Sequence, residues 1–149
     1  MSSSESTAHL RSILVPVDGS HPSMQAVGLA CELARKNKGR VFAVHVIEVK
    51  RLLPLDAPMR GEEDAGEEVL LSAEKVAKKE GYRVESEILH AREAGPAIVD
   101  EAIARRADLI ILGMPYSRPF GEYEVGRVAE YVLRSAPCEV WLCRHRVGE

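Results

Sequence analysis

The chain has 149 residues, enough for one ordinary domain and too few for two comfortable ones. Hydrophobic residues make up 46% of it and aromatic residues only 5%, so the core must consist mainly of Val, Ile, Leu and Ala, as in α/β sheets. The net charge of −3, with acidic and basic residues mixed throughout, argues against nucleic acid as a partner.

Residues 1–10 are predicted to be a flexible tail, because this segment lacks the apolar core of a signal peptide. A single domain is expected over residues 11–147. No apolar stretch approaches the ~20 residues needed to cross a bilayer. An odd number of cysteines, three, fits a reducing compartment. These features predict a cytoplasmic protein that does not insert into membranes.

Strand and helix patterns then alternate along the chain. The apolar, β-branched run SILVPV over residues 12–17 predicts the first strand, and Ser20 is the expected N-cap of the helix that follows and ends near Gly39. The remaining predicted elements are a strand over 40–48, an irregular connection over 50–61, a helix over 62–80, an outer strand over 82–89, a helix that opens at 95–96, a strand over 108–112, a helix that ends before 135–137 and a strand over 138–144.

This β-α-β alternation predicts an α/β fold, an open parallel sheet with helices on both faces. Ligands of such sheets bind beyond the carboxyl ends of the strands, where the strand order reverses. The ends of the first and fourth strands are the natural candidates. Asp18 and Gly113 are therefore expected at the same crevice. The apolar spacing of Val125, Val128, Ala129, Val132 and Leu133 marks the last helix.

Several motifs that would assign a chemistry are missing. The sequence has neither GxxxxGK[ST] nor GxGxxG, so a P-loop NTPase and an ordinary Rossmann dehydrogenase are both disfavoured. Cys138 and Cys143 fall on opposite faces of the predicted last strand and cannot hold a metal together. His45, inside the second strand, is interpreted as a core or cleft residue rather than a base. No catalytic or metal-binding residue is predicted.

Four segments of the chain resemble the universal stress protein family, of the UspA-like type. They are ILVPVDGS at 13–20, AGPAIVDEA at 94–102, ADLIILG at 107–113 and VAEYVLRSAPCEVWLCR at 128–144. The resemblance implies a Rossmann-like, five-stranded parallel sheet of order 3-2-1-4-5, and a homodimer built by contact of the last strands. The apolar run Val140, Trp141 and Leu142 supports that interface, because an uncovered apolar edge invites pairing.

Members of this family that bind ATP carry G-x2-G-x9-G-[ST] after the fourth strand. Here Gly113 and Gly126 match the first and third glycines, but Tyr116 replaces the second and Arg127 replaces the Ser or Thr. A bulky residue does not readily adopt the backbone that a phosphate cradle needs. Arginine side chains could instead hold phosphate through their planar guanidinium groups. The alternative is that Arg118 and Arg127 pair with Glu122 and Glu124 on the surface.

Two interpretations of Asp18 stand side by side: a turn or helix-cap residue, and a carboxylate that accepts hydrogen bonds from a ribose. The resemblance favours the second and implies an adenine nucleotide (ATP, ADP or AMP), bound as a regulatory signal. The expected ligand contacts are Pro16, Val17, Asp18, Ser20, Val46, Leu112, Gly113, Tyr116, Gly126, Arg127 and Val128.

Two other functions remain open. The first is a nucleotide-free dimerisation and docking module for stress response or transporter regulation, with Tyr116 and Phe120 filling the crevice. The second is a slow ATPase or autophosphorylating protein that uses Ser117 or Ser20.

Overall fold

A computed structural model describes residues 7–114 and 126–144 of the chain. Within those residues the strands are β1 (Ser12–Pro16), β2 (Arg40–Glu48), β3 (Val84–Ala91), β4 (Leu109–Gly113) and β5 (Glu139–Cys143), and the helices are α2 (His21–Asn37), α3 (Arg60–Lys79), α4 (Ala94–Ala104) and α5 (Arg127–Ser135). The predicted alternation is confirmed, with element ends shifted by one or two residues.

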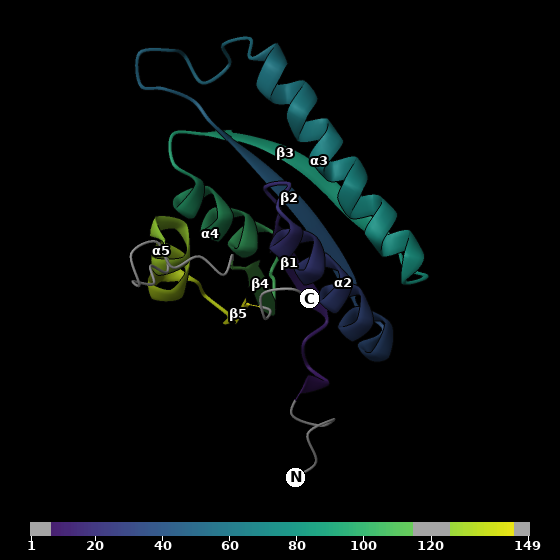
Figure 1. Ribbon diagram of the computed structural model, residues 1–149. Coiled ribbons are helices and arrows are strands. Elements are labelled where there is room, and N and C mark those ends of the chain that lie inside the picture. Colours follow the sequence, from purple (N-terminus) through teal and green to yellow (C-terminus); the bar gives the residue numbers. More distant parts are fainter. Residues whose placement is uncertain (1–6, 115–125, 145–149) are drawn as a thin grey trace, which may run out of the picture.

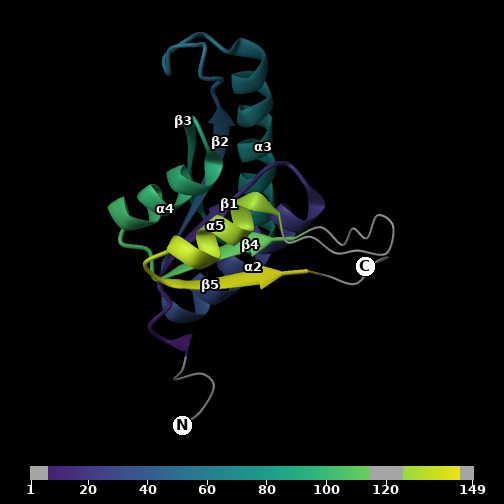
Figure 2. The same cartoon turned by 90° about the vertical axis from the view of Figure 1, so that its left-hand side faces the viewer.

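All five strands are parallel and lie in the order β3-β2-β1-β4-β5. Helices α2 and α3 cover one face of this sheet and α4 and α5 cover the other, as Figures 1 and 2 show. The predicted fold class and the strand order implied by the family resemblance are both confirmed. Consequently β1 and β4 are the neighbours between which the order of the strands reverses.

Each face of the sheet carries its own aliphatic core. Alternate residues of a strand point to opposite faces, so Ile13 and Val15 pack beneath α2 and α3, whereas Leu14 packs beneath α4 and α5. Phe42 is the single aromatic side chain among the buried hydrophobic residues in the described part of the chain. This matches the Val, Ile, Leu and Ala core expected from composition.

The packed part of the chain begins before the predicted domain boundary at residue 11. Leu10 was assigned to the flexible tail, but its side chain is fully buried in the core. The Nδ2 amide of Asn37 donates to the carbonyls of Thr7 and Leu10, at 2.7 and 3.0 Å. Burial of an apolar side chain and two hydrogen bonds from α2 therefore hold this segment on the domain.

The buried face of α5 is narrow, and Val125, the first residue of the predicted pattern, lies outside the described residues. Ala129 and Val132 are buried, but Leu133 is 50% exposed. This helix packs against α4 and β5 at the edge of the sheet, so only a thin stripe of it meets the core. In the described part of the chain, none of the helices has both the length and the apolar character to cross a membrane.

Candidate functional site

The pairing of β1 with β4 stops before either strand ends. Their pairing covers Ile13 and Leu14, whereas β1 stays paired with β2 as far as Pro16. The N–H of Val17 donates to the carbonyl of Val44 at 2.8 Å, so the backbone of Val17 faces β2 and that of Pro16 faces β4. Proline has no N–H to offer there. The β1–β4 pairing therefore stops at the switch point, which is where the sequence predicts the ligand crevice.

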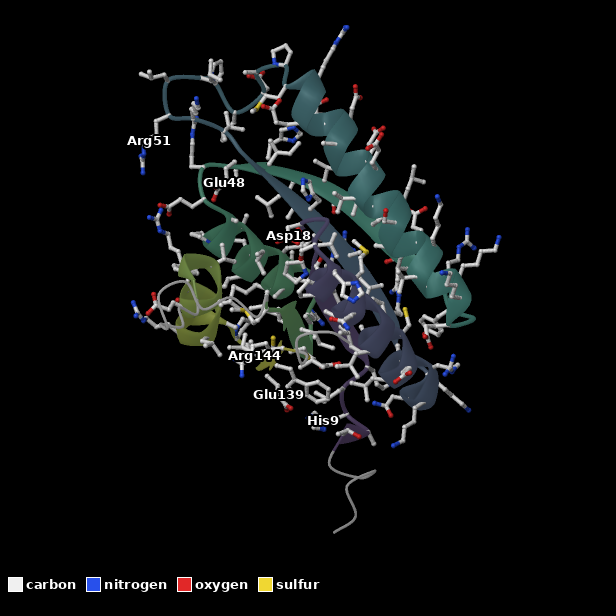
Figure 3. All side chains as sticks on the ribbon, viewed as in Figure 1. His9, Asp18, Glu48, Arg51, Glu139 and Arg144 are labelled. Atoms are coloured by element: carbon white, nitrogen blue, oxygen red, sulfur yellow. The ribbon has the colours of Figure 1, made fainter. Side chains whose placement is uncertain are left out.

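Asp18 begins the turn that leads from this crevice into α2. Its Oδ1 accepts from the backbone N–H of Ser20 at 2.9 Å, which is the predicted Asx turn. The Oγ of Ser20 in turn accepts from the N–H of Ser23 at 3.3 Å and caps α2. Figure 3 shows Asp18 near the middle of the molecule, while Glu48 and Arg51 lie at the outer end of β2.

Burial raises the pKa of the Asp18 carboxyl, but hydrogen bonds from Ser20 and Ser23 outweigh that effect and hold the pKa below its ordinary value. The group is therefore a carboxylate at neutral pH. Its side chain is exposed. A fixed, ionised and accessible acceptor suits the hydroxyl groups of a sugar.

Gly113 has a packing reason to be glycine. A Cβ on this residue would lie 2.1 Å from the carbonyl oxygen of Pro22 and 2.7 Å from the backbone nitrogen of Ser23. The end of β4 thus lies directly against the first turn of α2. The sequence interpretation tied Gly113 to phosphate access alone, and the structure adds this close backbone contact.

Val17 and Leu112 were predicted as ligand contacts, but their side chains face the cores. They are 3% and 6% exposed and lie on opposite faces of the sheet. Only their backbone groups remain to face the crevice. Ser20 is likewise occupied in capping α2. These three residues therefore shape the crevice more than their side chains line it.

The backbone of Val46 offers the least expected feature of the site. Val44 faces β1, whereas the N–H of Val49 donates to Ala91 at the end of β3, so the even-numbered residues of β2 face β1. Strand β1 ends at Pro16, short of Val46. Among the described residues, the N–H and the C=O of Val46 have no hydrogen-bond partner. A donor and an acceptor therefore stand side by side at the crevice.

A cavity of about 430 Å³ adjoins Val46 at the carboxyl end of β2. Its volume is within the range of small-molecule sites. It is lined by His45, Val46, Ile47, Glu48, Lys50, Leu53, Met59, Glu62 and Ala65. Leu53 and Met59 come from the connection that the sequence marked only as irregular. No motif in that segment signals a cavity, because its residues converge only once β2 and α3 are packed.

The predicted phosphate end of the site is partly described. Gly126 takes φ 94° and is the N-cap of α5, where no side chain caps the helix. Arg127 follows it and is exposed, and Val128 packs against the core beneath α4 and α5. Uncapped N–H groups at a helix start attract anions. Tyr116, the remaining predicted contact, lies outside the described residues.

Comparison with known proteins places these features among relatives. The model of the universal stress protein family matches residues 9–144. A universal stress protein of Methanocaldococcus jannaschii is 30% identical over 136 residues, which cover 87% of this chain and 79% of that protein.

Solved structures agree with the sequence relatives. A universal stress protein from Archaeoglobus fulgidus superposes with a TM-score of 0.76 and 27% identity, over 89% of this chain and 97% of that one. A structure of the universal stress protein from Archaeoglobus fulgidus in complex with dAMP superposes with a TM-score of 0.72 and 25% identity, over 89% of this chain and 96% of that one. A universal stress protein family protein from Arabidopsis thaliana with AMP bound shares the fold. Its TM-score is 0.64 and its identity 18%, over 92% of this chain and 93% of that one.

Proposed function

The chain belongs to the universal stress protein family, and we propose that it binds an adenine nucleotide beyond the carboxyl ends of β1, β2 and β4 as a regulatory signal. One observation carries the proposal: the unpartnered N–H and C=O of Val46 at the crevice. The Watson–Crick edge of adenine presents the acceptor N1 beside the donor N6 amino group, which is the complementary pattern. The relative solved with dAMP supports the same ligand class.

The other groups of the crevice fit the rest of a nucleotide. The Asp18 carboxylate would accept from the ribose hydroxyls, since Ser20 already holds it in place. The uncapped start of α5 would attract the phosphates, and the exposed guanidinium of Arg127 would neutralise part of their charge. Because Gly113 has no Cβ, the end of β4 can lie against the first turn of α2, close to Asp18.

A signalling role is proposed in preference to turnover. An efficient general base has a pKa near the working pH, and the pKa of Asp18 is shifted the other way. We expect nucleotide to be bound and released intact. Incubation with radiolabelled ATP, followed by separation of the products and of the protein, should show neither released phosphate nor labelled protein.

Titration of ATP, ADP, AMP and GMP into the full chain, followed by calorimetry, tests the proposal. The adenine nucleotides should bind, and GMP should bind more weakly because its N1–H and O6 oppose the N–H and C=O of Val46. Asp18→Ala should weaken AMP binding at least about tenfold, since a hydrogen bond to a charged group contributes about 1.5–3 kcal/mol. Asp100→Ala, at an exposed position on α4, is the matched control. Equal affinity of wild type and Asp18→Ala would contradict the assignment.

We also propose that the protein is a homodimer paired through β5. In the part of the chain that the structure describes, this strand is an edge of the sheet and pairs with β4 alone. Leu142 on it is 37% exposed. A nucleotide-free docking module, with Tyr116 and Phe120 in the crevice, is the competing function, and both residues lie outside the described part of the chain. Nucleotide released from the denatured protein would favour the first function over the second.

A further inference from the structure

At the end of β1, a side chain replaces one backbone hydrogen bond of the β1–β2 ladder. The register pairs Pro16 with Val44, so Val17 stands beside His45. In a parallel ladder the N–H of Val17 donates to Val44, as it does here, and its carbonyl accepts from the N–H of Val46. The carbonyl of Val17 instead meets the Nδ1 of His45 at 2.8 Å. A carbonyl only accepts, so Nδ1 carries the proton in this contact.

The imidazole ring is held in place from its other side by α3. A Cβ on Gly66 would lie 2.8 Å from Cδ2 of His45 and 3.4 Å from its Nε2. Gly66 is buried within the helix, where glycine costs about 1 kcal/mol relative to alanine. The missing side chain leaves the space that the ring occupies between β2 and α3.

We propose that His45 is a positioning residue that keeps the backbone N–H of Val46 available to a bound ligand. It does so by satisfying the carbonyl of Val17, the acceptor with which that N–H would otherwise pair. The proposal rests on the adenine site described above, because the freed N–H is the group assigned to N1 of the base. His45 itself need not touch the ligand.

Amide hydrogen exchange of Val46 in the 15N-labelled full chain tests the proposal without any ligand. In wild type this amide should exchange rapidly. In His45→Phe, which keeps a ring but loses the donor, Val46 should pair with Val17, and its exchange should slow at least tenfold relative to wild type. His45→Asn is the conservative control, because its Nδ2 stands where Nδ1 stood and should keep the exchange fast.

Gly66→Ala reaches the same contact from α3 and leaves His45 chemically intact. The added methyl should push the ring from Val17 and slow the exchange of Val46 as His45→Phe does. Gly28→Ala is its matched control, since a Cβ on Gly28 of α2 meets only Val76, at an ordinary 3.7 Å. Thermal melting of each variant identifies those that remain folded, and the comparison uses these.

AMP titration supplies the second readout. His45→Phe and Gly66→Ala should each weaken AMP binding about threefold to tenfold, the effect of one neutral hydrogen bond, and His45→Asn should restore it. Equal Val46 exchange in wild type and His45→Phe would overturn the inference, whatever the nucleotide result. Absence of AMP binding by wild type, with the exchange difference present, would overturn the proposed function and leave the role of His45 in the ladder supported.

Discussion

At the scale of single residues, Asp18 combines a structural and a binding task. Its Oδ1 is committed to the N–H of Ser20, and this hydrogen bond orients the carboxylate that would face the ribose. The structural and functional interpretations of Asp18 are therefore compatible, because a carboxylate has about four acceptor positions and the turn occupies few of them.

The depressed pKa of Asp18 predicts how stability depends on pH. The folded-state pKa lies below the ordinary value of 3.8, so the carboxylate stabilises the folded protein above that value, and the contribution is lost as the pH falls through the folded pKa. Asp18→Asn keeps the acceptor but never carries the charge. Urea denaturation at several pH values should show a constant difference between the two proteins above about pH 5 and a shrinking one below pH 3.8. A difference that does not vary with pH would contradict the linkage.

Gly113→Ala should destabilise the domain. The new Cβ would meet the backbone of Pro22 at 2.1 Å, and backbone cannot move aside as a side chain can. Overpacking of this kind typically costs about 1–3 kcal/mol. Gly61→Ala, where the added carbon has nothing within 4 Å, should be neutral or slightly stabilising. Urea midpoints of both variants measure the contrast, and an equally stable Gly113→Ala would show that β4 can shift away from α2.

Local residue chemistry was predictable from the sequence, whereas the backbone chemistry of the site was not. Asp18 forms its turn with Ser20, two residues away, and Ser20 caps α2 through Ser23, three residues away. Contacts this close in sequence can be predicted from a local pattern. The free N–H of Val46 depends on the register of β1 against β2, and His45 contacts a carbonyl 28 residues away. Hydrophobic periodicity fixes which face a strand presents, but it does not distinguish registers that differ by two residues.

At the scale of elements, Pro16 determines how far β1 and β4 stay together. Pro16→Val would restore an N–H directed at β4 and favour extension of the ladder. We expect a higher urea midpoint together with weaker AMP binding, because the crevice would narrow. Pro137→Val, at an exposed position before β5, is the control and should leave AMP affinity unchanged. Stronger AMP binding by Pro16→Val would refute this account of the crevice.

Element boundaries in the structure differ from the predicted ones where a tertiary contact competes with the local sequence pattern. The third strand was predicted over 82–89, but β3 begins at Val84. Tyr82 remains outside it and donates its hydroxyl to the carbonyl of Gly39. Leu133 continues the apolar spacing that marks α5, yet the helix sits at the sheet edge and leaves this side chain exposed. Neither the hydrogen bond of Tyr82 nor the exposure of Leu133 can be inferred from the spacing of apolar residues alone.

At the scale of the whole molecule, the alternation of strands and helices predicted the parallel sheet but not the order of its strands. The order came from the family resemblance, because right-handed crossovers permit several arrangements of five strands. The outer position of β3 was the exception. Its alternation of exposed charged residues, Glu85 and Glu87, with the more buried Val84 and Ile88 reflects a strand covered mainly on one face.

The proposed dimer can be tested through the two hydrogen-bonding edges of β5. The carbonyl of Cys143 accepts from the N–H of Met114, so the odd-numbered residues of β5 face β4 and the even-numbered ones face outward. Leu142→Pro removes an outward N–H and spares the ladder to β4. It should convert a dimer into a folded monomer, measured by analytical ultracentrifugation and thermal melting.

Trp141→Pro is the matched variant on the same strand. It removes an N–H that faces β4, so it should lower the melting temperature by breaking the internal ladder, whereas Leu142→Pro should leave the monomer fold intact. A monomeric wild type, or a Leu142→Pro variant that stays dimeric, would exclude pairing through the β5 edge. In either case the two exposed apolar side chains of α5, Tyr131 and Leu133, would become the next candidates, one on each of two sides of that helix.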